Sequence, residues 1–479
     1  MTMAFDRRTA NKAFLAALAG CGVPTLARGA ESAGSTASET LKAEVCVVGG
    51  GSGGLGAALA AARAGAQVVL LERESIVGGT STNAWVSNWE PSAGADGLPR
   101  ELYMAMQADP LGVTYPDYRI AAVRRGGKGL PFEPRVLNLV ARRLLEATGR
   151  CRVLMGTTFY RAHVQSDRIT AVDAWFHGKH LRVEAPVFID STADGDVAVD
   201  AGCEFHLGED PKSRYQEPTA PETAELRLNG LTLCYRVTDT GVRQKPYLPP
   251  DIREGLCPRS VHIMVMPNGD HVLNAVDMLN GNAILYEDYG HLMDEAHRRV
   301  VEHFHWLQTL DPKRGLPWTR YTDGKGYATW AIVGVAPRIG VRESRRILGD
   351  YVLTEHDCQA GARNQKHPDL IALTDHAVDL HGHKGRLYEV PNGAYGVPYR
   401  CLLPRGIRNL LIACRAASFS HIAASSCRLS RTMMTLGQAA GTAAAMCVAQ
   451  HVSPREVDVS KLQASLQAAG VAVSCEGPA

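Results

Sequence analysis

Residues 43–74 read AEVCVVGGGSGGLGAALAAARAGAQVVLLERE, a strand, a glycine-rich turn, a helix and a second strand in close succession. The β-branched Val45, Val47 and Val48 are typical of a buried parallel strand, and a G-x-G-x-x-G turn follows at once. The order of these parts, more than the glycines alone, predicts a βαβ unit that binds a dinucleotide.

The glycine turn and the end of the second strand supply the predicted contacts to the dinucleotide. Gly49 permits the tight turn, Gly51 lets the backbone approach a pyrophosphate, and Gly54 lets the helix pack closely on the strand. The start of the helix offers free N–H groups to the phosphates. A carboxylate at Glu72 accepts the ribose hydroxyls and disfavours the 2′-phosphate of NADP, so FAD and NAD remain. The predicted contacts are Gly49, Gly51, Ser52, Gly53, Gly54, Glu72 and Arg73.

Three further stretches bear on the choice between FAD and NAD. Residues 75–82 (SIVGGTST) place a second glycine pair directly after the first unit. Residues 186–203 (PVFIDSTADGDVAVDAGC) indicate a buried strand that runs into an Asp/Gly turn. Residues 408–450 give a strand at 410–413, a loop, and a helix rich in small residues.

Together with RESRR at 342–346, GDY at 349–351 and VPYR at 397–400, these stretches resemble the FAD-dependent oxidoreductases related to fumarate reductase flavoproteins. The resemblance covers about residues 43–450. It implies FAD as the cofactor, with further contacts from Gly79, Thr80, Ser81, Asp194 and Gly437. Two motifs depart from the family: Ser191-Thr192-Ala193 stands where Ala-Thr-Gly is expected, and Cys414-Arg415 stands where Gly-Arg is typical.

The resemblance implies an α/β fold, with a Rossmann-like FAD-binding domain of the glutathione-reductase type and an inserted α+β substrate or cap domain. We predict the FAD-binding domain in two parts, residues 43–203 and 401–450. The cap spans residues 204–400 and a C-terminal tail spans 451–479. Within these units we expect a helix after Pro134, a short β-meander over 152–186, and a helix with a basic face around 342–346. No second glycine turn of this type follows a strand, so the electron acceptor is expected to be a separate molecule.

Composition excludes several other classes. Lys and Arg number 51 against 49 Asp and Glu, a net charge of +2, which gives no general attraction to nucleic acid. Twelve cysteines show no C-x-x-C spacing and are expected to be mostly buried thiols. Beyond residue 30 no apolar run approaches the roughly 20 residues of a transmembrane helix.

The first 30 residues resemble an export signal of the twin-arginine type. Arg7 and Arg8 are followed by Lys12 and an Ala/Leu-rich run that is too short to span a bilayer. Cys21 ends this run as in a lipoprotein box, and residues 31–42 fit a flexible linker. We therefore expect a periplasmic or envelope-associated protein, with a cytoplasmic protein carrying an unstructured tail as the alternative.

The candidate catalytic residues lie in the predicted loop before the last helix. His421 can exchange a proton near neutral pH, and Arg415 and Arg428 can hold a carboxylate or another oxygen of the substrate. The alternative for His421 is an ordinary loop histidine, and the alternative for Arg428 is an ion pair beneath the flavin. A second cluster has His376, His381 and His383 beside Asp375 and Asp379, but nothing fixes three ligands on one face. We therefore expect no metal and interpret the cluster as a cap surface or as substrate contacts.

The leading hypothesis is an FAD-dependent oxidoreductase that moves a hydride between a small polar substrate and flavin N5. A sugar-like alcohol, a hydroxy acid or an enoate would suit such a pocket. The alternatives are a flavin enzyme without net redox turnover, such as an isomerase or hydratase, and a non-catalytic FAD-binding protein. The sequence carries no indication of an oligomeric state.

Overall fold

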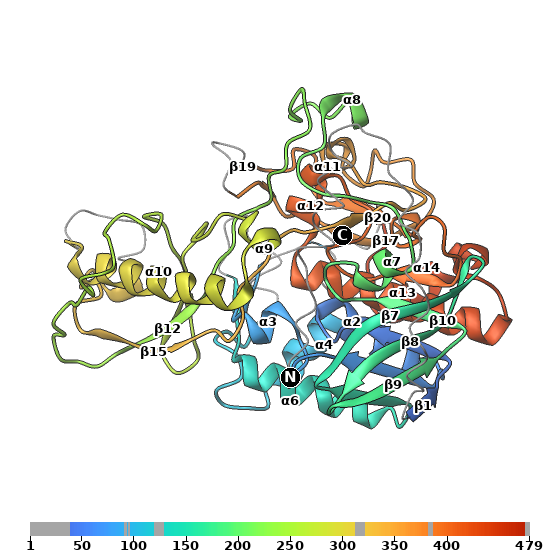
Figure 1. The fold of residues 1–479 in the computed structure, drawn as a ribbon, viewed down its shortest axis with the longest axis horizontal. Helices are drawn as coiled ribbons and strands as arrows, with labels where there is room; N and C mark the ends of the chain where they lie inside the picture. Colours follow the sequence, from blue (N-terminus) through green and yellow to red (C-terminus); the bar gives the residue numbers. More distant parts are fainter. Residues whose placement is uncertain are drawn as a thin grey trace.

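The computed structural model describes residues 39–90, 93, 96–118, 129–311, 321–381 and 387–474. The predicted export signal with Cys21, most of the linker at 31–42, and His383 lie outside these residues. Figure 1 shows a mixed α/β body that contains both the blue and the red ends of the described chain, with a smaller domain projecting from one side.

A five-stranded parallel sheet forms the centre of the body. Its order is β21-β10-β2-β3-β6, so segments far apart in sequence lie side by side. Strands β2, β3, β10 and β21 are fully buried, which explains their unbroken runs of Val, Leu and Ile. The bounds are β2 Val45–Val48, β3 Val68–Glu72, β6 Cys151–Met155, β10 Val187–Asp190 and β21 Leu410–Ile412. The predicted βαβ unit and both later strands are confirmed.

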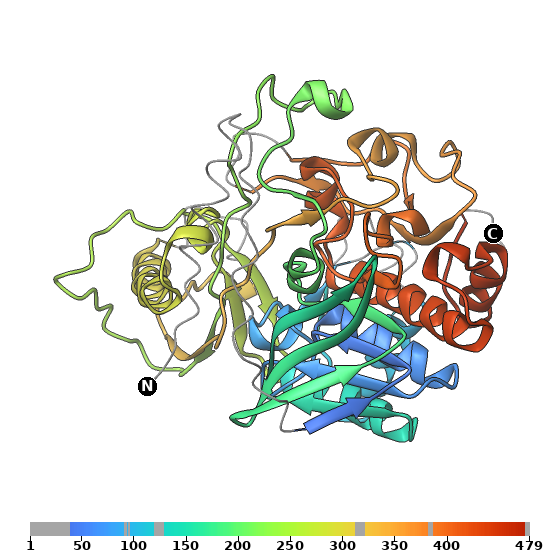
Figure 2. The same cartoon turned by 45° about the vertical axis from the view of Figure 1, so that its right-hand side comes forward.

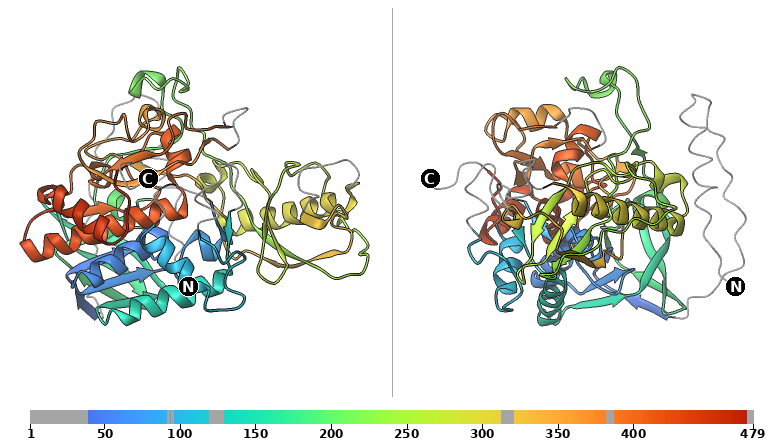
Figure 3. Two further views of the ribbon diagram at one scale, coloured as in Figure 1. Left: turned by 180° about the vertical axis from the view of Figure 1, so that it is seen from behind. Right: turned by 90° about the vertical axis from the view of Figure 1, so that its left-hand side faces the viewer.

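Two helices, α2 (Ser52–Arg63) and α13 (Ser430–Gln450), pack alongside each other in very close contact on this sheet (Figure 3, left). A Cβ atom at Gly437 would lie 1.9 Å from the carbonyl oxygen of Gly53, and one at Gly441 would lie 2.1 Å from that of Ala57. Gly437 is therefore a helix-packing residue. Its predicted contact with the cofactor is not supported, because it lies in the helix contact and does not line the cavity described below.

The other elements of the body surround this centre. Helix α6 (Pro134–Ala147) confirms the helix predicted after Pro134. The meander predicted over 152–186 is formed by β7 (Thr157–Gln165), β8 (Arg168–Phe176) and β9 (Lys179–Glu184), with β1 (Glu39–Lys42) along its edge, whereas residues 152–155 belong to β6 of the parallel sheet. The predicted C-terminal tail instead contains α14 (Val459–Ala468). Leu462 and Leu466 of α14 are fully buried in the main core because they lie one helical turn apart on its inner face.

The projecting domain has a hydrophobic core of its own, drawn from residues 231–339 (Figure 2). An antiparallel sheet of order β13-β14-β12-β15 packs against the long helix α10 (Tyr289–Thr309). The strands are β12 Tyr235–Asp239, β13 His262–Val265, β14 His271–Asn274 and β15 Trp330–Val335, and α9 Ala283–Tyr286 precedes α10. We call this unit the cap. Its core is narrower than the predicted 204–400, because many of the buried side chains described between Ile347 and Leu403 pack into the main core.

Short elements complete the fold. The helices are α3 Thr80–Asn83, α4 Leu98–Met106, α7 Asp196–Asp200, α8 Lys212–Tyr215, α11 Glu355–Ala360, α12 His421–Cys427, η3 Tyr399–Leu402 and η4 Pro454–Glu456. The paired short strands are β4 Asn88–Trp89 with β5 Leu130–Pro131, β11 Phe205–His206 with β16 Arg346–Ile347, β17 Leu370–Thr374 with β20 Tyr395–Pro398, and β18 Val378–Asp379 with β19 Leu387–Tyr388.

Two expectations from composition can be compared with the described residues. The cysteines among them are free thiols and, apart from the half-buried Cys151, are buried. None of the helices in the described ranges is long and apolar enough to cross a membrane.

The helix contact predicts a specific stability effect. Gly437→Ala should lower the free energy of unfolding by about 1–3 kcal/mol, because the new methyl group meets a backbone carbonyl that cannot move aside. Thr442→Ala on the half-buried side of the same helix is the matched control and should change it by less than about 0.5 kcal/mol. Urea denaturation measures both. A Gly437→Ala variant stabilised by its higher helix propensity, by up to about 1 kcal/mol, would contradict the close contact.

Candidate active site and cofactor channel

A cavity of about 1050 Å³ runs along the carboxyl ends of the parallel strands. We call it the channel. It begins between the end of β3 and the start of β7 and passes over the glycine turn toward the end of β10. Its lining includes the predicted cofactor residues Gly49, Gly51, Glu72, Arg73, Gly79, Thr80 and Asp194. A crevice outside the carboxyl ends of parallel strands is where α/β sheets bind nucleotides.

The backbone of the glycine turn can be built only without side chains. Gly49 has φ +99°, and a Cβ atom there would lie 2.2 Å from the carbonyl oxygen of Ser191. A Cβ atom at Gly54 would lie 1.7 Å from the carbonyl oxygen of Gly49. The first contact holds β2 against the loop after β10, and the second draws the start of α2 onto the turn. Gly54 thus shapes the channel by packing and does not line it.

Glu72 is held ready at the outer end of the channel. One carboxylate oxygen accepts a hydrogen bond of 2.6 Å from Gly50 N, and the other accepts one of 2.8 Å from Glu74 N. Burial raises the pKa of Glu72, and these two N–H donors oppose that shift. The fixed carboxylate, the glycine cradle and the long channel fit a dinucleotide, so these residues would hold FAD by its ribose and pyrophosphate.

The turn after β10 contains the first departure from the family motif. Ala193 takes the place of a glycine and has φ +74°, a conformation that costs an L-residue roughly 1–2 kcal/mol. The Ser191 hydroxyl donates 2.9 Å to the carbonyl oxygen of Ala413, a bond that alanine would lack. Asp190 accepts hydrogen bonds from the Thr192 and Ala198 N–H groups. The departure therefore keeps the shape of the turn.

Asp194 forms the link between the channel and the catalytic candidates. It accepts hydrogen bonds of 2.6 Å from both the Ser344 hydroxyl and Arg415 Nη2. Burial alone would raise its pKa, but Arg415 and Ser344 hold the pKa of Asp194 down at about 2. Asp194 is therefore an ionised acceptor on the channel wall, and Arg415 is oriented by it.

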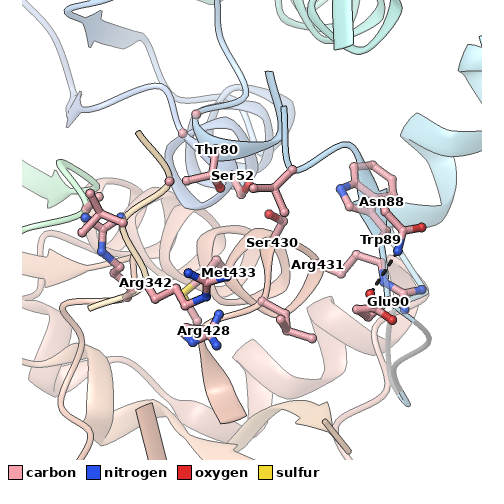
Figure 4. Close-up of a pocket in the computed structure, with 18 of the residues that line it drawn as sticks. Ser52, Thr80, Asn88, Trp89, Glu90, Arg342, Arg428, Ser430, Arg431 and Met433 are labelled. Carbon is pink, nitrogen blue, oxygen red and sulfur yellow. Dashed lines mark hydrogen bonds between the residues drawn. The ribbon is translucent and has the colours of Figure 1, made fainter. Parts of the chain in front are cut away.

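A second cavity of about 310 Å³ opens from the inner end of the channel, and we call it the chamber. The two share Gly51, Gly79, Thr80, Ala193 and Arg415. Figure 4 shows Ser52 and Thr80 above the chamber, Arg342 and Arg428 on one side, and Asn88, Trp89 and Glu90 on the other. The volume suits a small organic molecule.

Guanidinium groups dominate the chamber wall. Arg415 Nε, Arg428 Nε and Arg431 Nη2 are buried and have no hydrogen-bond partner among the described residues. Arg428 lies 3.8 Å from Asp379, but Asp379 is closer to His381, at 2.6 Å. Burial and the neighbouring Arg342 lower the pKa of Arg428 to about 10. Buried cations with open donors indicate a site for an anion.

The chamber also presents acceptors. Asn88 Oδ1 and Asn274 Oδ1 are buried without a hydrogen-bond partner in the described part of the chain. The ring nitrogen Nδ1 of His376 donates 2.7 Å to the carbonyl oxygen of Ala377, so the lone pair of the neutral ring is at Nε2. Burial and Arg428 lower the pKa of His376 from its ordinary 6.5, which keeps the ring neutral.

His421 does not belong to the chamber, and its predicted role is corrected here. It is the first residue of α12, 1% exposed, and lines neither cavity. Its Nδ1 lies 2.7 Å from a carboxylate oxygen of Glu343, which also pairs with Arg346 at 2.6 Å. Arg346 in turn pairs with Asp210 at 2.9 Å. His421 is part of a buried ion-pair network that ties α12 to the body.

The basic run at 342–346 was expected to be a helix, and this prediction is wrong. Residues 341–345 have no regular structure and Arg346 begins β16. The arginines of this run reach different partners: Arg345 pairs with Asp196, while Arg342 donates to the Gly230 carbonyl oxygen at 2.6 Å and lines the chamber.

The remaining predicted residues divide between the cavities and their supports. Ser52 and Gly53 line the chamber, as do Arg415 and Arg428. Ser81 is buried behind the wall, where its hydroxyl donates 3.1 Å to Ser430. The described residues contain no cluster of metal ligands. The sequence pattern did not indicate Arg431, and it predicted only a cap surface or substrate contacts for the cluster around His376.

The family comparison now bears on this geometry. The model of the family described as FAD dependent oxidoreductase matches residues 44–466. The chain belongs to this family. It is therefore an FAD-dependent oxidoreductase, and the resemblance and the cofactor predicted from the sequence are confirmed. No curated protein matches the chain.

Two solved structures with a similar arrangement are distant from this chain in sequence. A geranylgeranyl bacteriochlorophyll reductase-like protein from Thermoplasma acidophilum is 12% identical over 90% of this chain and 83% of that chain, with a TM-score of 0.46. The p-nitrophenol 4-monooxygenase of Pseudomonas putida is 14% identical over 92% of this chain and 91% of that chain, with a TM-score of 0.44.

The left-handed Ala193 gives a prediction for the channel. Ala193→Gly should raise the free energy of unfolding of the FAD-free protein by about 0.5–2 kcal/mol, because glycine adopts φ +74° without strain. Ala201→Gly, at a residue with an ordinary φ of −76°, should lower it. Denaturant titration measures both variants, and an Ala193→Gly variant less stable than the parent protein would contradict the strain.

Proposed function

We propose that this flavoprotein oxidises a hydroxyl group of a small hydroxy acid, passing a hydride from the substrate carbon to flavin N5. The observation that carries the proposal is the set of buried, unpartnered guanidinium donors at Arg415, Arg428 and Arg431 on the chamber wall. When bound, FAD supplies the two-electron acceptor that such an oxidation requires. The protein has to bind the substrate, orient it and remove a proton.

The arginines select for a carboxylate. A buried N–H donor without a hydrogen-bond acceptor is energetically costly. An anionic or strongly accepting ligand would supply the acceptor for each of these donors. A bound carboxylate would also offset the repulsion between the neighbouring guanidinium groups of Arg342 and Arg428. A neutral sugar-like alcohol lacks the charge to do this, which favours an acid among the substrate classes considered.

The acceptors select for hydroxyl groups. Asn88 Nδ2 donates 3.0 Å to Glu90, which fixes the amide so that its Oδ1 is the open acceptor. Asn274 Oδ1 is a second open acceptor on the same wall. A ligand that forms hydrogen bonds with all of these groups therefore has both an anionic group and O–H donors. A hydroxy acid has both, whereas an enoate has no O–H donor.

His376 is the proposed proton acceptor. Its hydrogen bond to the Ala377 carbonyl oxygen fixes the tautomer, and its lowered pKa keeps Nε2 unprotonated near neutral pH. Reduction of an enoate would instead require a protonated side chain that donates a proton to the substrate. Removal of the hydroxyl proton by Nε2 leaves the substrate as a carbonyl compound once the hydride has left.

We further propose that the nucleotide-binding unit is of the glutathione-reductase type. The parallel sheet joined to the β7–β9 meander, the glycine pair at residues 78 and 79, and the return of α13 to the glycine turn support this assignment.

The proposal predicts which compounds reduce the flavin. Under anaerobic conditions, small hydroxy acids should bleach the flavin absorbance of the FAD-loaded protein, whereas the corresponding uncharged alcohols should not. Arg428→Gln should raise the half-saturating acid concentration roughly 10- to 100-fold, since one charge-assisted contact is lost. Arg408→Gln removes only a surface pair with Asp167 and is the control. Equal bleaching by acids and neutral alcohols would overturn the substrate class.

Replacement of His376 should slow the reaction without weakening substrate binding. His376→Asn keeps a donor toward the Ala377 carbonyl oxygen but removes the acceptor Nε2, so the rate of flavin reduction should fall roughly 10²- to 10⁴-fold. His297→Gln is the control, because His297 Nδ1 also donates to a backbone carbonyl oxygen but lies on the exposed side of α10. An unchanged rate in His376→Asn would contradict the role of His376 as the base.

The same role fixes the pH dependence. His376 is surrounded by Arg428, Glu90 and Asp379, and its pKa lies below 6.5. The rate should rise with pH as His376 loses its proton and should level off below neutral pH. In His376→Asn this rise should be absent.

A further inference from the structure

The cap supplies one wall of the channel at its outer end, near Glu72. Residues 284–289 and Arg338 and Ile339 line the same cavity as Glu72 and Arg73. These cap residues come from α9, the start of α10 and the loop after β15. The glycine turn and Glu72 belong to the body, so the channel lies between the two domains.

A paired ion bridge joins the two walls. Arg338 Nη2 donates 3.0 Å to one carboxylate oxygen of Glu74, and Nε lies 3.0 Å from the other. The guanidinium carbon lies 5.5 Å from the ring centroid of Tyr289, and Arg338 N donates 3.1 Å to the Asn83 carbonyl oxygen. Burial alone would lower the pKa of Arg338, but Glu74 holds this pKa above its usual value.

The bridge stands beside the ribose carboxylate. Glu74 N donates to Glu72, the residue expected to accept the ribose hydroxyls. A movement of the cap away from the body would therefore remove the outer wall of the channel beside Glu72, where the adenosine half would lie. The glycine turn behind this wall would stay in place. Tyr286 is 47% exposed and lines the channel from the cap side.

From this juxtaposition we propose that the cap forms part of the cofactor site. Residues 284–289 cover the adenosine half of FAD from the solvent side, and the Arg338–Glu74 bridge sets the rate at which FAD leaves. The inference rests on FAD binding and not on the identity of the substrate.

Other contacts also hold the cap, and they limit the expected effect. Trp85 and Val86 of the body pack against the cap core, and Arg236 of the cap lies 2.9 Å from Glu133 of the body. Loss of the bridge should loosen only the wall at the adenosine end. We expect FAD to leave roughly three- to tenfold faster, as for one partly exposed ion pair.

The test measures FAD release from the full-length, FAD-loaded protein. Flavin fluorescence, followed after dilution, should rise three- to tenfold faster in Arg338→Gln and in Glu74→Gln. The charge-swapped double variant Arg338→Glu with Glu74→Arg should return to within about threefold of the parent rate. Arg298→Gln breaks a cap ion pair with Asp251 that does not line the channel, and it should release FAD at the parent rate.

Two results would overturn the proposal: parent release rates in both single variants, or a double variant as fast as the singles. If the charge variants fail to fold, as judged by circular dichroism, Tyr286→Ala decides the matter, since this side chain is half exposed and outside both cores. It should release FAD about threefold faster, and an unchanged rate would refute the role of the cap wall.

Discussion

The close approach of α2 and α13 is the constraint on which the site depends. The backbone oxygens of Gly53 and Ala57 occupy the space that side chains at Gly437 and Gly441 would need. This contact brings together two segments separated by most of the chain, and it sets the start of α13 against the glycine turn. Arg431 reaches the chamber from that end of α13, beside Ser52 and Gly53 of α2. A wider helix separation would move the arginine-bearing wall away from the channel.

The buried arginines are of two kinds: those whose charge is matched by nearby carboxylates, and those with open hydrogen-bond donors at the chamber. Arg346 is fully enclosed but pairs with Glu343 and Asp210, so its charge is matched inside the protein. Arg428 is buried with an open Nε and a carboxylate no closer than 3.8 Å. Unmatched buried charge is costly and is retained where a ligand completes it. We therefore assign the proposed substrate binding to the second group, although both groups look alike in sequence.

The sequence alone predicted the parts that depend on local pattern. The βαβ unit, the second glycine pair, α6 and the meander follow from periodicity and turn residues, and the family and its cofactor followed from their order. The roles of Gly437 and His421 were mispredicted because helix packing and a buried ion-pair network determine them, and neither leaves a local signal. For the cluster around His376 the sequence predicts only a cap surface or substrate contacts, because the proposed role of His376 follows from a hydrogen bond to its neighbour's carbonyl oxygen and from Arg428, which lies far away in sequence.

The central claim is that a carboxylate binds in the arginine chamber at the inner end of the FAD channel. Titration of the FAD-loaded protein with oxalate, an anion without a hydroxyl group to oxidise, tests this most directly through the flavin absorption spectrum. We predict a saturable difference spectrum whose half-saturation concentration rises at least tenfold in Arg428→Gln, together with no change in the spectrum when a neutral diol is added. A flavin spectrum that oxalate leaves unchanged at all concentrations, or an equal response in Arg428→Gln, would contradict the account.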